Sequence, residues 1–115
     1  MEKKFFTLTV RVNEELNEAF SDFSKSKGLT ASFAVKRFVQ QFVERRELPF
    51  SLSNTGAVRK GPSVSMKVYM DFETRAAFSD ACKAIDETVT MSHVVRGFME
   101  YCVANNRFPD MSVNA

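Results

Sequence analysis

The side chains that most often perform chemistry are scarce in this sequence. His93 is the single histidine, which excludes a catalytic triad built on histidine together with a multi-histidine metal site. Cys82 and Cys102 are too few for a disulfide framework or a zinc knuckle, and we expect them to be buried, reduced thiols. The four glycines, at positions 28, 56, 61 and 97, form no phosphate-binding loop. We therefore expect no enzymatic activity, no metal and no cofactor.

The composition is that of one globular domain. The chain has 115 residues, of which 44% are hydrophobic and 26% charged, and these values argue against wholesale disorder. No apolar run approaches the ~18 residues that a membrane helix needs. The first residues lack the features of a secretory signal, so we expect a cytoplasmic, nucleoid-associated protein without membrane contact.

The net charge of +2 neither requires nor excludes a nucleic-acid partner. Its distribution is uneven. Residues 1–60 carry 11 lysines and arginines against 7 acidic residues, whereas residues 61–115 carry 5 against 7. If both halves contact an anionic partner, the first half should hold it more firmly.

The chain contains one unit twice. The tetrapeptide Ala19-Phe20-Ser21-Asp22 recurs as Ala77-Phe78-Ser79-Asp80, and flanking residues such as Val10 and Val68 match in the same register. After an insertion near Asp86 the match resumes, for example between Phe38 and Phe98. Such a repeat has to be found before a fold is assigned. We assign residues 1–50 to copy one, 51–62 to a polar linker, 63–109 to copy two and 110–115 to a tail.

Each copy begins with alternating apolar residues, which is typical of a strand with one buried face. The apolar residues are Phe6, Leu8, Val10 and Val12 in copy one and Val64, Met66, Val68 and Met70 in copy two. Two amphipathic helices follow in each copy. We expect their N-caps at Asn13, Thr30, Asp71 and Thr90, and we expect the phenylalanines of the helices in the core.

A single strand–helix–helix unit leaves both strand edges unpaired and its helices without a core. Two units remove this problem if their strands pair. The expected fold class is α+β, mostly α, with β-α-α twice and a two-stranded antiparallel ribbon over four helices. The strands can pair within one chain, as an intramolecular pseudo-dimer, or between two chains that exchange copies.

This order of elements resembles the ribbon-helix-helix superfamily of Arc, MetJ and CopG type repressors. The segment from Gly28 to Phe38, followed by Glu47-Leu48-Pro49-Phe50, further resembles RelB/DinJ-type antitoxins. Two units in one chain is similar to the TraY accessory proteins of conjugative plasmids. The resemblance implies a tandem ribbon-helix-helix fold that binds double-stranded DNA.

The resemblance also implies which residues touch DNA. In the family, outward residues of the ribbon read base edges in the major groove, and the start of each second helix clamps phosphates. Carried over to this sequence, the base-reading residues are Thr7, Thr9, Arg11, Ser65, Lys67 and Tyr69. The phosphate-binding residues are Thr30, Ser32, Thr90 and Ser92. Tyr69 departs from the small or polar residues usual at such a position.

Each of these assignments has a plainer alternative. The ribbon residues could form only the solvent face of an amphipathic strand, and the threonines could only cap their helices. Arg59 and Lys60 in the linker either reach phosphates or are simply solvated.

Three functions are consistent with the sequence. The first is a sequence-specific DNA-binding protein that acts as a repressor or as a plasmid or relaxosome accessory factor, with cooperative self-association on DNA. The second is an antitoxin-like module that binds a protein partner, against which the short tail after Pro109 argues. In the third, copy two does not contact DNA and only completes the fold.

Overall fold

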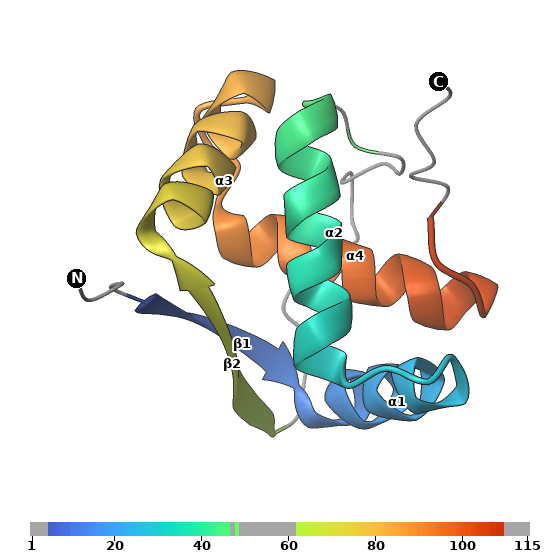
Figure 1. Ribbon diagram of the computed structural model, residues 1–115. Helices are drawn as coiled ribbons and strands as arrows, with labels where there is room; N and C mark the ends of the chain where they lie inside the picture. The colour runs from blue at the N-terminus through green and yellow to red at the C-terminus, as the bar shows by residue number, and fades with distance from the viewer. Residues whose placement is uncertain (1–4, 47, 49–61, 110–115) are drawn as a thin grey trace.

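The described part of the chain folds into a two-stranded ribbon and four helices (Figure 1). This computed structural model describes residues 5–46, 48 and 62–109, and for Phe5 and Phe6 it describes the backbone alone. Along the chain the elements are β1 (Phe5–Asn13), α1 (Glu14–Ser26), α2 (Ala31–Arg45), β2 (Ser63–Asp71), α3 (Phe72–Ile85) and α4 (Met91–Asn105). This order, β-α-α-β-α-α, fits a tandem β-α-α arrangement.

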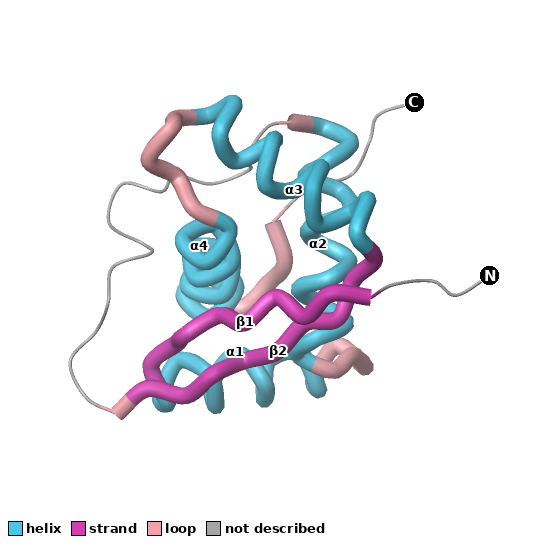
Figure 2. The backbone as a smooth tube through the Cα atoms, turned by 90° about the vertical axis from the view of Figure 1, so that its left-hand side faces the viewer, coloured by secondary structure: helices cyan, strands magenta, loops and turns pink. Residues whose placement is uncertain are grey.

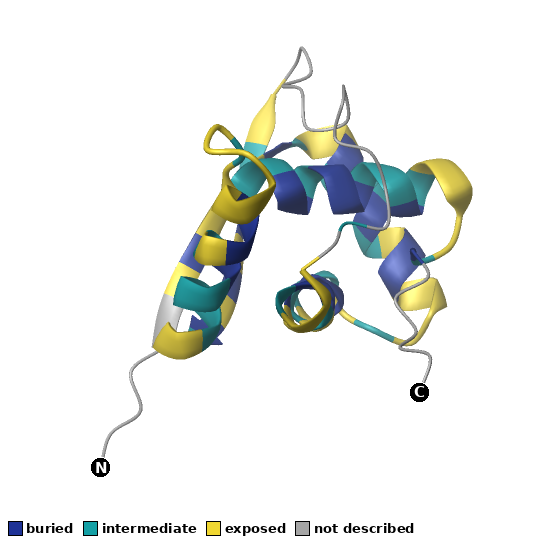
Figure 3. Ribbon diagram, turned by 90° about the horizontal axis from the view of Figure 1, so that it is seen from above, coloured by how far each residue is buried: buried dark blue, intermediate teal, exposed yellow. Residues whose placement is uncertain are grey.

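The two strands of the ribbon belong to the same chain. β1 pairs with β2 antiparallel, from Phe5 opposite Asp71 to Asn13 opposite Ser63. One face of the ribbon is buried and the other is exposed, as the alternating colours along the strands in Figure 3 show. The residues that the strands bury are Leu8, Val10, Val12, Met66, Val68 and Met70. The predicted alternation is therefore confirmed at these six positions, whereas Val64 is half-buried and the burial of Phe6 lies outside the description.

Local capping fixes where each helix begins. The side chain of Asn13 accepts hydrogen bonds from the amides of Glu15 and Leu16, at 2.9 and 3.3 Å. Asp71 accepts from the amide of Thr74 at 3.2 Å. The pKa of the Asp71 carboxyl is lowered, mainly by a hydrogen bond with the side chain of Thr74 and to a lesser extent by this amide. Thr30 and Thr90 cap the second helices. All four predicted N-caps are thus confirmed, because a cap depends on residues only two or three positions away.

The core lies between the ribbon and the helices and is rich in phenylalanine. At its centre Phe38 of α2 stacks on Phe98 of α4, with ring centroids 4.2 Å apart. Phe20 of α1 meets Phe98 edge-on at 5.6 Å, and Phe42 of α2 meets Phe78 of α3 edge-on at 5.9 Å. Each helix therefore contributes at least one aromatic ring to a single core.

The predicted arrangement, a ribbon over a group of four helices, is wrong in this form. All helices lie on one side of the ribbon (Figure 2) and all four contact it, but α1 and α3 have more contact with another helix than with either strand. α1 packs mainly against α4, and α3 mainly against α2. The reason is geometric: α1 and α3 begin directly after the two strands, and antiparallel strands end at opposite ends of the ribbon. The first helices therefore leave from the two ends of the ribbon.

Some predictions concern residues outside the described part of the chain. Residues 51–61 of the predicted linker, with Arg59 and Lys60, and the predicted tail 110–115 belong to this group. Among the described helices, none is long and apolar enough to cross a membrane.

Candidate nucleic-acid interface

The outward face of the ribbon carries all six residues predicted to read bases. All six are exposed, because they alternate with the buried residues along each strand. The register makes them three directly opposed pairs, which are Thr7 with Tyr69, Thr9 with Lys67, and Arg11 with Ser65. Six side chains that the sequence separates into two groups thus form one continuous surface.

The six side chains are polar and include two cations, Arg11 and Lys67, and no acid. The other four side chains bear hydroxyl groups, which can both donate and accept hydrogen bonds. Asp71, at the end of β2 on the same face, is half-buried and caps α3. The guanidinium of Arg11 is held in place, because its Nε donates to the Oγ of Ser63 at 3.0 Å. Sequence reasoning missed Ser63, although its spacing of two from Ser65 puts it on the same face of the strand.

The start of each second helix, α2 and α4, has an ordinary N-cap in which a threonine hydroxyl accepts from a backbone amide. The Oγ1 of Thr30 accepts from the amide of Phe33 at 3.1 Å. In the same way, the Oγ1 of Thr90 accepts from the amide of His93 at 3.1 Å. Thr30 and Thr90 are exposed, whereas Ser32 and Ser92 are half-buried. The two threonines therefore cap their helices, as the plainer alternative predicted. This capping is compatible with a further role of the backbone amides that come before the capped amide in each helix.

The second helices flank the two outer edges of the ribbon. The hydroxyl of Ser32 in α2 donates to the backbone carbonyl of Lys67 in β2 at 3.1 Å. On the other side, Nη1 of Arg96 in α4 donates to the backbone carbonyl of Arg11 in β1 at 3.2 Å. Burial lowers the pKa of Arg96. These bonds satisfy carbonyls that an edge strand would leave to solvent, and they hold α2 beside the middle of β2 and α4 beside Arg11, near the end of β1.

Ser32 therefore differs from its predicted role. Its hydroxyl proton goes to the ribbon, so the side chain positions α2 instead of donating to a phosphate. Arg96 was not among the predicted site residues. Both bonds join residues far apart in the sequence, and no local pattern indicates them.

Two helical phenylalanines lie outside the core, contrary to expectation. Phe33 is 54% exposed and Phe72 is 58% exposed. Phe33 precedes the buried positions Ala34 and Val35 of α2, and this places it beside the buried stripe. Phe72 is the first residue of α3 and directly follows the ribbon. Together with Tyr69, which is 61% exposed, they make one end of the ribbon aromatic.

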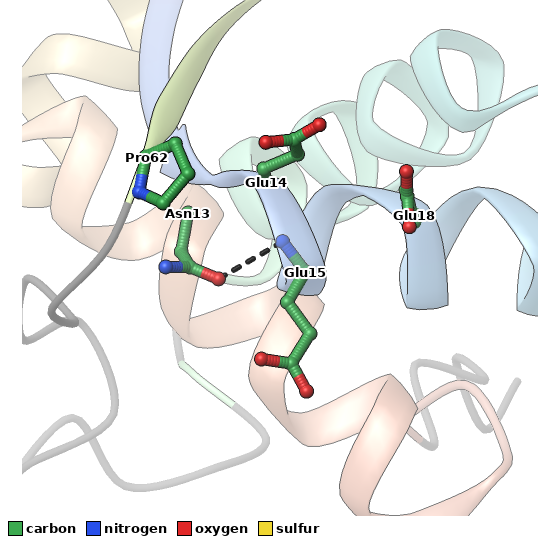
Figure 4. A pocket seen from close by; sticks show the side chains of 5 residues that line it. All are labelled: Asn13, Glu14, Glu15, Glu18 and Pro62. Atoms are coloured by element: carbon green, nitrogen blue, oxygen red, sulfur yellow. Dashed lines mark hydrogen bonds between the residues drawn. The ribbon is translucent and has the colours of Figure 1, made fainter.

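A shallow pocket of about 220 Å³ lies where β1 passes into α1 (Figure 4). Its lining includes three carboxylates, and Figure 4 shows that these point in different directions. Among the described residues, no group of three or more histidine, cysteine, aspartate or glutamate side chains is arranged to hold a metal ion. The residues that line it are Asn13, Glu14, Glu15, Glu18 and Pro62.

The two cysteine thiols lie in the core. Cys82 of α3 and Cys102 of α4 are free and buried, as predicted. Burial raises the pKa of each thiol to about 12, so the reactive thiolate is suppressed at neutral pH. His93 lies in the first turn of α4 and is half-buried.

Comparison of the chain with protein-family models, with curated proteins and with solved structures found no match.

Proposed function

We propose that this protein binds double-stranded DNA in a sequence-specific manner, with its ribbon in the major groove. One observation carries the proposal. The six outward residues are exposed and form three opposed pairs, which include two cations and no acid. A strand face that only contacts solvent does not need to carry cations and exclude acids, whereas a surface that approaches phosphates and base edges does.

The dimensions of the ribbon support this proposal. Paired strands lie about 4.8 Å apart, and the major groove of B-DNA is about 12 Å wide, so a two-stranded ribbon enters it with its side chains. Both strands have nine residues, which gives the outward face several positions along the groove.

The side chains match the hydrogen-bonding groups of base edges. Arg11 and Lys67 can donate to O6 and N7 of guanine, which is the commonest specific contact of these residue types. Nε of Arg11 donates to Ser63, so in this proposal the two Nη groups are the ones that donate to guanine. Thr7, Thr9 and Ser65 can bond to any of the bases.

The flanking helices supply the phosphate contacts in this proposal. A helix leaves its first amides without partners inside the helix and favours an anion at that end. The Oγ1 of Thr30 accepts a hydrogen bond from the amide of Phe33. In this proposal a phosphate oxygen accepts from the amides of Ala31 and Ser32. Because α2 and α4 lie on opposite edges of the ribbon, the two helix starts would hold the backbones on both sides of the groove.

The resemblance to ribbon-helix-helix regulators supports the same activity. It favours a role as a repressor or as a plasmid accessory factor, and it favours side-by-side binding of several chains. In this proposal the protein carries out no reaction, and its partner is duplex DNA.

Selection of bound duplexes from a random pool, followed by sequencing, tests the proposal. The expected result is an asymmetric motif, because the two strands present different side chains. The double variant Arg11→Ala/Lys67→Ala should lose the motif. Its control, Lys25→Ala/Lys83→Ala, removes the same charge from exposed, repeat-equivalent positions on α1 and α3 and should keep it. Absence of any enriched motif, or equal binding by the two variants, contradicts the proposal.

A further inference from the structure

The two repeats are related by a local two-fold axis through the ribbon. Strand residues 58 positions apart correspond, as Val10 corresponds to Val68. The register places Thr9 opposite Lys67, and these residues are themselves 58 positions apart. The axis therefore passes between them and relates Arg11 at one end of the ribbon to Tyr69 at the other.

The two ends of the ribbon carry different chemistry at corresponding positions. Arg11 corresponds to Tyr69, and Glu14 at the start of α1 corresponds to Phe72 at the start of α3. In the first turn of the second helices, His93 corresponds to Phe33. We call Arg11, Glu14 and His93 the polar end, and Phe33, Tyr69 and Phe72 the aromatic end.

The aromatic end is one region of the surface. The bond from Ser32 to the carbonyl of Lys67 holds the first turn of α2 beside β2, and Phe33 directly follows Ser32. Tyr69 lies two residues beyond Lys67 on the same face of β2. Phe72 begins α3 where β2 ends, and α2 packs against both β2 and α3.

Three large aromatic side chains more than half exposed are a costly feature for a small domain, and such patches commonly mark an interaction site. This patch is continuous with the candidate DNA surface through Tyr69 and Lys67. The exposed cations Arg37, one turn after Phe33 on α2, and Lys67 lie next to it, and they complement a phosphate backbone better than a neutral apolar partner. Of the two acids beside Phe72, Asp71 is engaged in capping α3 and Glu73 is exposed.

We propose that the ribbon binds DNA in a single orientation, with Tyr69, flanked by Phe33 and Phe72, against thymine methyl groups and with Arg11 against guanine. The inference rests on the proposed function and adds the base preference of each end. Thymine is the base that presents an apolar group in the major groove, where an aromatic ring can contact it. Guanine presents two acceptors, O6 and N7, to which a guanidinium can donate.

Replacing single thymines of the selected duplex by deoxyuridine tests this inference, because that change removes the methyl group alone. Loss of one buried methyl should weaken binding of the wild-type protein about fourfold at the position under Tyr69. Tyr69→Ala should be insensitive to that replacement. Tyr69→Phe, which keeps the ring, and Ser65→Ala, at the other end of the ribbon, should remain sensitive. Arg11→Ala should relax the preference for guanine at the opposite end of the motif.

The outcomes separate the two proposals. A wild-type protein that binds no duplex selectively overturns the proposed function itself. Selective binding in which deoxyuridine affects wild type and Tyr69→Ala equally at every position overturns the orientation inference alone. A chain that forms dimers without DNA, and loses them on Phe33→Ala/Tyr69→Ala substitution, assigns the aromatic end to a second copy and overturns the inference as well.

Discussion

Phe38 stacks on Phe98, the residue at the same position of the other repeat, with ring centroids 4.2 Å apart and ring planes 10° apart. Both rings are 2% exposed. The stack lies between α2, which packs on β2, and α4, which packs on β1. One pair of aromatic rings thus joins the two repeats beneath the surface that we propose for DNA binding.

Truncation of this stack should be strongly destabilising. Phe98→Ala removes a buried ring that also meets Phe20 edge-on, and we expect a loss of about 3–5 kcal/mol in the free energy of unfolding. Urea denaturation followed by circular dichroism measures it. Phe33→Ala removes an exposed ring and should change stability by about 0.5 kcal/mol or less. Equal losses in the two variants would show that the stack does not join the repeats.

The pairing of β1 with β2 in one chain predicts unimolecular folding. The midpoint of denaturation should be independent of protein concentration, since no second chain completes the ribbon. Sedimentation in the absence of DNA should give the mass of one chain, 13.1 kDa. A midpoint that rises with concentration would instead favour two chains that exchange copies.

Single substitutions on the ribbon should act on specificity more than on stability. Arg11→Ala and Lys67→Ala should each weaken binding of the selected duplex by about 1–3 kcal/mol and relax the preference at one base position. Ser63→Ala should weaken binding less than Arg11→Ala, because it frees the guanidinium without removing it. Fluorescence anisotropy with single-base variants of the duplex measures these changes. If Lys67→Ala changes nothing, copy two only completes the fold.

The buried thiols should make the protein sensitive to alkaline pH. Their pKa is about 12 in the fold, above the ordinary value of 9.0, so the folded state favours the protonated thiols. Their contribution to stability is complete below about pH 9 and is lost as the pH rises towards 12. A Cys82→Ala/Cys102→Ala variant lacks this contribution, so the stability difference between wild type and variant should shrink over that range. A thiol reagent at pH 8 should label the native chain only as fast as it unfolds.

Much of the fold is predictable because it depends on local signals. Asn13, Thr30, Asp71 and Thr90 cap helices through residues at most three positions away, and period-two alternation identifies both strands. The internal repeat then indicates that the strands pair. These signals need no knowledge of the rest of the molecule.

The contacts that complete the site are not local. The bonds from Ser32 to the carbonyl of Lys67 and from Arg96 to the carbonyl of Arg11 join residues 35 and 85 positions apart. No periodic pattern indicates such bonds, because they depend on where the second helices cross the edges of the ribbon. The predicted arrangement of helices around the ribbon was wrong for a related reason. It follows from the packing of α1 on α4 and of α3 on α2, which is a property of the assembled core.

Exposure of Phe33 was also missed, because hydrophobicity alone assigns a phenylalanine to the core. Its position beside the stripe that begins at Ala34 was the available signal. For Phe72 the signal was its place directly after the cap Asp71, before the helix has turned towards the core.

The ribbon in which β1 pairs with β2 of the same polypeptide also affects how such a protein can change over generations. In a symmetric pair of identical chains, one altered codon appears twice and changes both halves of the contact surface together. Here an altered codon for Arg11 leaves its counterpart Tyr69 untouched. Each half of the surface can thus acquire a new base preference through single mutations while the other half still binds its own part of the DNA site.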